Sequence, residues 1–230
     1  MGMRGRWVSG WAAVLLTFCL LNWGAALADA DPDQPHPHRG ILPPYEPGAM
    51  DIVLDEEQLE KLDKGKLVRM TIENEDTGGT GIGIMDIAAP TDTVWSRIMG
   101  FEHYPDWVGP VKFCEVYAQS GDTIRTHVKV SGFLYSYEYF LINVFCPEYD
   151  QLLWTLDYDR TSEFDDCVGA WYVEAHPDKE GWSRAWFSTD LKLNSPIPGF
   201  LMGWIKKKGI KDAISWVKEQ SELAMEAGVE

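Results

Sequence analysis

The feature that most constrains this chain is a series of six closely spaced strand-like runs, in several of which apolar and polar side chains alternate. Such alternation is typical of β-strands with one face buried. Turn signals at Ser120–Asp122, Pro147–Asp150 and Pro177–Gly181 separate several of them. Consecutive strands this close leave no room for crossover helices, so they predict an antiparallel meander. The segments are residues 111–118, 123–133, 135–145, 151–158, 168–175 and 183–193.

The C-terminal region predicts a long amphipathic helix. Residues 199–227 carry a broad apolar stripe, and the opposite side carries Lys207, Lys211, Lys218 and Glu222. A helix with such a stripe must bury it, and the sheet is the large partner available. The stripe consists of Met202, Ile205, Gly209, Ile210, Ala213, Ile214, Val217 and Ala224.

The region before the meander predicts further elements. Residues 66–75 and 80–87 alternate around a Gly-containing turn and are expected to form a first strand or a hairpin. Pro90 is a favoured helix start, so residues 90–99 predict a helix, which a compact turn at 103–107 follows. The expected fold is α+β: a curved antiparallel sheet of about six or seven strands wrapped around the C-terminal helix, with short helices after the first strand.

Several stretches resemble the helix-grip superfamily, which includes birch-pollen-allergen-like, START and polyketide cyclase/dehydrase proteins. The chain looks like its shorter coenzyme-Q-binding or cyclase/dehydrase branch. The resemblance covers residues 66 to 224. It rests on Ile87 to Trp95, Tyr104 to Trp107 with Val111, Gly169 to Trp171, the strand 185–193, and Pro198 to Phe200.

The resemblance implies a cavity between the sheet and the last helix that holds a hydrophobic small molecule. Strand alternation then suggests its walls: Ile124, Thr126, Val128 and Val130 should point inward, and Arg125, His127 and Lys129 outward. The same reasoning turns Ala185, Phe187, Thr189, Leu191 and Leu193 inward. The face of Tyr135, Tyr137 and Tyr139 stays open because their neighbours are equally apolar. The expected ligand-binding residues are Trp107, Thr126, Val128, Trp154, Trp171, Phe187, Thr189, Leu191, Met202, Ile205, Gly209 and Ile210.

The first 28 residues have the layout of a signal peptide. Arg4 and Arg6 precede an apolar run, and Ala26 and Ala28 provide small residues for cleavage after Ala28. The same run could instead remain as an uncleaved membrane anchor. Export is expected in both cases, to the medium, a periplasm or a secretory lumen. The expected organisation is a signal peptide at 1–28, a Pro-rich linker at 29–50, a short surface helix at 51–65 and the ligand-binding domain at 66–226.

The charge argues against nucleic acid as a partner. The chain has a formal charge of −16, and removing the signal peptide takes away two arginines and no acid, which leaves −18. One basic stretch next to an aromatic ring stands out and predicts either a transient membrane contact or a solvated helix face. It consists of Trp204, Lys206, Lys207, Lys208 and Lys211.

No nucleophilic or metal-based catalytic set is predicted, and no cofactor. The five histidines are scattered, which argues against a triad or a metal cluster. The acids between Asp157 and Asp166 predict a solvated loop. Cys114, Cys146 and Cys167 allow one disulfide at most, and free thiols are favoured. We therefore predict a carrier for a lipid, isoprenoid or polyketide-like molecule, with a polyketide cyclase/dehydratase that uses polar groups in the same cavity as the alternative.

Overall fold

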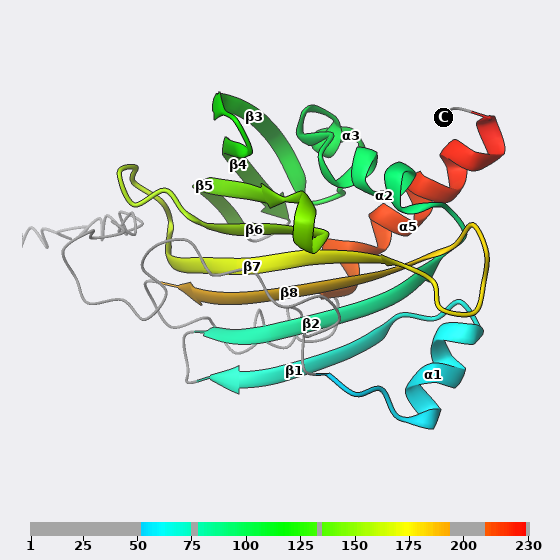
Figure 1. The fold of residues 1–230 in the computed structure, drawn as a ribbon. Helices are drawn as coiled ribbons and strands as arrows, with labels where there is room; N and C mark the ends of the chain where they lie inside the picture. Colours follow the sequence, from blue (N-terminus) through cyan, green and yellow to red (C-terminus); the bar gives the residue numbers. More distant parts are fainter. Residues whose placement is uncertain (1–51, 75–77, 133–134, 194–209, 229–230) are drawn as a thin grey trace, which may run out of the picture.

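The computed structural model describes residues 52–74, 78–132, 135–193 and 210–228. These residues form one eight-stranded sheet in the order β1-β2-β8-β7-β6-β5-β4-β3, in which all neighbouring strands are antiparallel (Figure 1). The sequence predicted about six or seven strands. The count is higher because the first two alternating segments form two separate strands, β1 (Val68–Asn74) and β2 (Gly78–Ile87), paired as a hairpin.

The other six strands follow the predicted meander. Each pairs with the next along the chain, and β8 then closes the order by pairing with β2. The largest shift from prediction is at β7, which begins at Phe164 rather than at 168, with a register irregularity between Phe164 and Asp166. The strands are β3 (Val111–Ser120), β4 (Thr123–Gly132), β5 (Tyr135–Cys146), β6 (Gln151–Leu156), β7 (Phe164–Ala175) and β8 (Ser183–Leu193).

Helix starts follow local chemistry. At α1 (Glu56–Asp63), the Asp55 carboxylate accepts from the Gln58 amide and the Gln58 side chain accepts from the Asp55 amide, so both residues satisfy free helix-end donors. Pro90 precedes α2 (Thr91–Ile98). The turn predicted at 103–107 is η1 (Phe101–His103) followed by α3 (Tyr104–Trp107), and η2 (Pro147–Tyr149) links β5 to β6.

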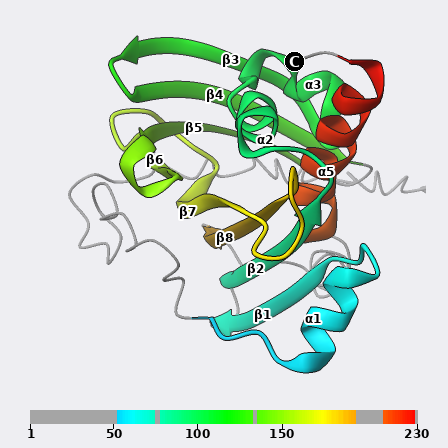
Figure 2. The ribbon, with the colours of Figure 1, turned by 45° about the vertical axis from the view of Figure 1, so that its right-hand side comes forward.

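Helix α5 (Ile210–Ala227) is the described part of the predicted C-terminal helix, and residues 199–209 lie outside the described ranges. It crosses one face of the sheet, the inner face, while α1 lies against the other, the outer face (Figure 2). Two apolar cores result. The inner core contains Ile214 and Val217 of α5, and the outer core contains Leu62 of α1 with Tyr172 and Trp186.

Two glycines of β2 let α5 approach the sheet closely. A Cβ on Gly81 would overlap the Ile210 side chain, and a Cβ on Gly83 would overlap that of Ile214. The nearest atoms at both positions are the Cδ1 ends of these isoleucines. The two glycines therefore leave room for isoleucine side chains of the helix to lie directly against the strand.

The edge strand β3 is irregular. Its pairing with β4 shifts register between Val111 and Phe113 and again between Val116 and Ala118.

Within the described part of the chain, no helix is long and apolar enough to cross a membrane.

Candidate functional site

The inner face of the sheet is the candidate ligand-binding surface. Strand register places Val128 of β4 opposite Tyr139 of β5, and Val130 opposite Tyr137. The rings of Tyr137 and Tyr139 lie 5.3 and 4.6 Å from that of Phe164. Both tyrosines therefore belong to the inner face, which resolves the alternative that the sequence left open for them. The side chain of Tyr135 is outside what the structure describes.

Aromatic rings continue along this face onto β6, β7 and β8. The Phe187 ring centroid lies 4.8 Å from Trp171 and 5.5 Å from Trp154. Gly169 makes room for Trp154, because a Cβ at this position would overlap both the indole ring and the Ser188 carbonyl. Packing against Trp154 and the β8 backbone thus explains why a glycine stands at position 169.

Several side chains of the inner face are only partly covered by the described residues. Val130, Tyr137, Tyr139, Leu141 and Leu191 pack on the inner core but stay only partly buried. Burial nevertheless raises the pKa of the Tyr139 phenol well above its ordinary value. Ligand contact at Tyr139 stays a prediction.

Most polar groups on the inner face are already engaged. The Asn143 amide donates to the Thr126 hydroxyl at 3.0 Å and to the Ile124 carbonyl at 3.1 Å. The Thr189 hydroxyl donates to the Val168 carbonyl at 3.4 Å. The Tyr139 ring contacts that of Phe164, and within the described residues the Tyr139 hydroxyl makes no hydrogen bond.

The thiols on this face are unreactive. The three described cysteines are free, as favoured from the sequence. Burial raises the pKa of Cys114 and that of Cys167 to about 12. Since the thiolate is the nucleophilic form, these groups behave as apolar wall at neutral pH.

The structure gathers most of the residues predicted to bind ligand. Seven belong to the inner core or pack on it: Trp107, Val128, Trp154, Trp171, Phe187, Leu191 and Ile210. Thr126 is buried beside them and Thr189 is half-buried. Met202, Ile205 and Gly209 lie outside the described residues, as do Trp204 and Lys206 to Lys208, while Lys211 is exposed. Ligand contact itself stays a prediction for all of them.

Sequence reasoning missed two contributors to this face. Trp216 of α5 stacks on Trp107 at 6.1 Å and meets Tyr104 edge-on at 4.9 Å. Phe164 was outside the predicted strand. Trp216 lies beside Val217 of the helix stripe, so an aromatic at the edge of that stripe was the available signal.

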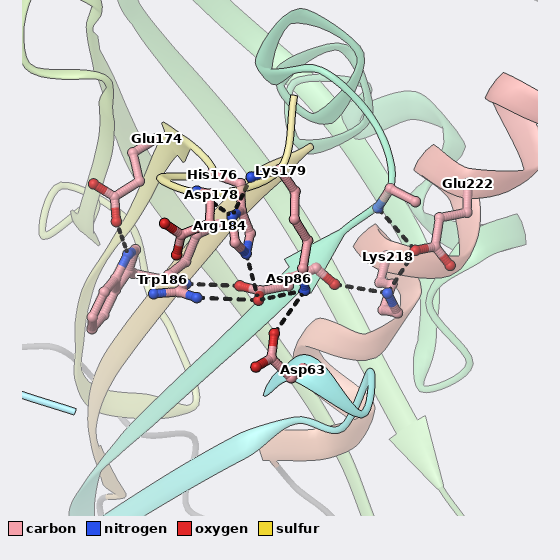
Figure 3. Close-up of polar contacts among 11 residues, drawn as sticks. Asp63, Asp86, Glu174, His176, Asp178, Lys179, Arg184, Trp186, Lys218 and Glu222 are labelled. Carbon is pink, nitrogen blue, oxygen red and sulfur yellow. Dashed lines mark hydrogen bonds and ion pairs between the residues drawn. The ribbon is translucent and has the colours of Figure 1, made fainter. Parts of the chain in front are cut away.

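A second polar cluster, the Asp86 cluster, lies where β2, β8 and the turn after β7 meet α5 (Figure 3). The Arg184 guanidinium donates to both Asp86 oxygens, at 2.7 and 3.1 Å, and His176 Nε2 lies 2.9 Å from Oδ2. Lys218 of α5 donates to the Asp86 carbonyl at 2.7 Å. Burial raises the pKa of Asp86, but the hydrogen bonds from Arg184 and His176 outweigh it and hold this pKa below its ordinary value.

His176 cannot act as a general base in this arrangement. Its Nδ1 accepts from the backbone amides of Asp178 and Lys179 at 3.0 and 3.1 Å, so Nε2 carries the proton and donates to Asp86. Both ring nitrogens are occupied. The Asp86 cluster therefore joins elements together and leaves no nitrogen for a substrate.

The prediction of a solvated acidic loop between Asp157 and Asp166 is wrong at both ends. Asp157 is 1% exposed and accepts hydrogen bonds from Arg125 and Tyr117, and Asp166 is 2% exposed and accepts from Tyr158 at 3.0 Å. A buried carboxylate needs such partners, and these carboxylates have them. Within the described ranges, no group of three or more His, Cys, Asp or Glu could hold a metal ion.

An open depression of about 420 Å³ lies between α2 and the β5–β6 turn, and its lining residues Trp95, Met99 and Phe145 also pack on the inner core. The Trp95 and Phe145 rings, 5.1 Å apart, form part of its wall. Its remaining lining is Asp92, Ser96, Met99, Pro147 and Asp150. It does not include any of the predicted ligand-binding residues.

A family model described as polyketide cyclase / dehydrase and lipid transport matches residues 87–215. This range begins at the last residue of β2 and ends within α5, so it includes the inner-face strands from β3 to β8. No curated protein matches the chain in sequence.

Solved structures with the same fold include the Zhui aromatase/cyclase from Streptomyces sp. R1128, 11% identical, with TM-score 0.54 over 69% of this chain and 96% of that one. A START superfamily protein from Mycobacterium smegmatis is 16% identical, with TM-score 0.53 over 63% and 97%. A STAR-related lipid transfer protein from Xanthomonas axonopodis is 8% identical, with TM-score 0.54 over 66% and 98%. The helix-grip fold expected from the sequence is confirmed.

Proposed function

Because the chain belongs to the polyketide cyclase / dehydrase and lipid transport family, we propose that it is an exported carrier that holds a hydrophobic small molecule against its inner face. The ligand is a lipid, an isoprenoid or a polyketide-like molecule. It lies between the sheet and the C-terminal helix.

The partly covered inner face is the observation that carries this proposal. Aromatic and aliphatic side chains there are only partly covered by the described residues, as at Tyr139 and Leu191. Covering partly exposed apolar surface with an apolar ligand is favourable in free energy. The inert thiols and the neutral walls suit storage better than chemistry.

Mass spectrometry of an organic extract of the purified protein tests the carrier function. We expect one class of apolar molecule in about stoichiometric amount. Phe187→Asp would place a charge in the apolar wall and should abolish co-purification, while Phe113→Asp, a change on an exposed ring, should leave it intact. A wild-type protein without any bound apolar molecule would count heavily against a carrier.

A cyclase/dehydratase remains the second candidate, and the Tyr139 phenol without a hydrogen-bond partner among the described residues favours it. A phenol in an apolar site can hold the carbonyl of a reactive chain in a folded shape. The assay is cyclisation of a linear poly-β-ketone thioester. A variant with Thr126→Val and Tyr139→Phe together should then be slower, and wild-type turnover by that variant would exclude this mechanism.

Export is supported by the sequence of residues 1–28. Expression in a secreting host followed by mass measurement should give a mature protein that begins at Asp29. Retention of residues 1–28 in a membrane fraction would favour the anchor instead.

Membrane contact through Trp204, Lys206, Lys207, Lys208 and Lys211 is also proposed, as the route by which a lipid enters. The support is the local positive charge on a chain of formal charge −16. Sedimentation with vesicles containing phosphatidylglycerol should show binding that salt weakens, and replacing the four lysines with glutamine should remove it.

A further inference from the structure

We propose that the open depression between α2 and the β5–β6 turn is a second binding site, which takes an organic ammonium group. This site is independent of the proposed carrier function, because none of the residues predicted to hold the hydrophobic ligand lines the depression. Its size, its aromatic wall and its charge together point to such a group.

The size and the wall of the depression suit a small organic group. Its volume of about 420 Å³ lies within the range of small-molecule pockets. The rings of Trp95 and Phe145 meet edge to face at 5.1 Å, and both are only half-buried, so aromatic surface remains accessible. Met99 and Pro147 add further apolar surface. Aromatic rings attract cations, and walls of this kind recognise quaternary ammonium groups.

The charge of the depression is negative. Asp92 in the first turn of α2 and Asp150 at the end of the β5–β6 turn both line it, and the described lining contains no Lys or Arg. Both aspartates are exposed, and within the described residues neither carboxylate forms a hydrogen bond or an ion pair. A divalent metal ion would need further oxygen ligands, and no group of three or more His, Cys, Asp or Glu lies together in the described ranges. Two carboxylates beside aromatic rings therefore favour an organic cation.

The backbone fixes the position of one of these carboxylates. Asp150 adopts a left-handed conformation with φ 52°, and its amide donates to the Pro147 carbonyl at 3.3 Å. Its own carbonyl accepts from the Val173 amide of β7 at 3.2 Å, which ties the turn to the sheet. Among residues other than glycine, asparagine and aspartate adopt this conformation most readily. Asp150→Asn therefore removes the charge and keeps the turn.

Choline and its neutral isostere 3,3-dimethylbutan-1-ol test the inference, because they have nearly the same shape and differ in charge. Binding to the full chain is measured by titration with saturation-transfer NMR. We expect wild-type protein to bind choline about five- to tenfold more tightly than the alcohol, and sodium chloride to weaken this preference. Sedimentation with phosphatidylcholine vesicles distinguishes the two sources of the cation: sedimentation that depends on Asp92 and Asp150 identifies a lipid head group, and choline binding without sedimentation identifies a free molecule.

A variant with Asp92→Asn and Asp150→Asn together should lower the choline affinity to that of the alcohol and leave alcohol binding unchanged. The matched control combines Glu56→Gln with Asp106→Asn, which changes the net charge equally at exposed positions outside the depression and should preserve the preference. Equal affinity of wild-type protein for the two probes, or a preference that survives in the Asp92 and Asp150 variant, overturns the inference. Neither result affects the extraction experiment, so the ammonium site and the carrier function can fail separately.

Discussion

Single residues explain where sequence reasoning about the site succeeded and where it could not. Alternation was enough to turn Thr126, Val128 and Phe187 inward. It could not reveal that Asp157 is buried, because its partner Arg125 is 32 residues away and the two meet only through the sheet. The pairing of His176 with Asp86 spans 90 residues and was invisible for the same reason.

Asp86→Asn should lower the free energy of unfolding at neutral pH and should make that free energy depend less on pH in the acidic range. The substitution leaves the buried Arg184 without its carboxylate, a loss of about 3–5 kcal/mol at neutral pH. The folded-state pKa of Asp86 is below the unfolded value of 3.8, so its stabilisation is present above that value and disappears as pH falls through the folded pKa.

Urea denaturation of both proteins between pH 7 and pH 2 measures this effect. The stability difference should be greatest at neutral pH and should shrink below about pH 4. Asp106→Asn, at an exposed position, serves as the control and should follow wild type throughout. A difference that stayed constant across the range would show that the charge of Asp86 is not responsible.

At the level of elements, apolar runs, period-two patterns and turn signals predicted nearly all strands and helices, even though β6 and most of β7 are buried on both faces. The face occupied by the tyrosines of β5 could not be predicted, because the two sets of alternating side chains on this strand are equally apolar. Only the register with β4 decides between them. The early start of β7 was not predicted, because its first residues include acidic side chains and pair irregularly with β8. Patterns give the elements, whereas register and irregularities arise from contacts between strands.

The packing of α5 on β2 gives the prediction at this scale. Ile214 is fully buried next to Gly83, so Ile214→Ala, which removes buried methyl groups, should cost about 2–5 kcal/mol. Leu223→Ala on the same helix removes a side chain that is 49% exposed and should cost far less. Thermal unfolding of both variants provides the comparison, and similar melting temperatures would show that α5 does not depend on this contact.

For the whole molecule, the important feature is that two cores share one sheet. The inner core and the outer core both draw residues from β2, β7 and β8, with Met85 on one side of β2 and Ile84 on the other. Neither core can lose these strands without exposing the other. The described residues therefore behave as one cooperative unit rather than as a barrel segment with an appended helix.

Unfolding by urea should consequently be a single transition. Tryptophan fluorescence reports on both cores, since Trp171 lies in the inner one and Trp186 in the outer one, and far-ultraviolet circular dichroism reports on the sheet. We expect the two curves to coincide. Two separated midpoints would mean that the outer core opens independently.

The irregular edge strand has a consequence for how copies of this protein coexist. An open sheet leaves backbone donors and acceptors unpaired along its last strand, and a straight edge of this kind recruits strands from other molecules. The two register shifts in β3 bend that edge strand, and the strand carries exposed charged side chains such as those of Lys112 and Glu115. The β3 edge is thereby a poor template for strand exchange with a second molecule and for fibril formation.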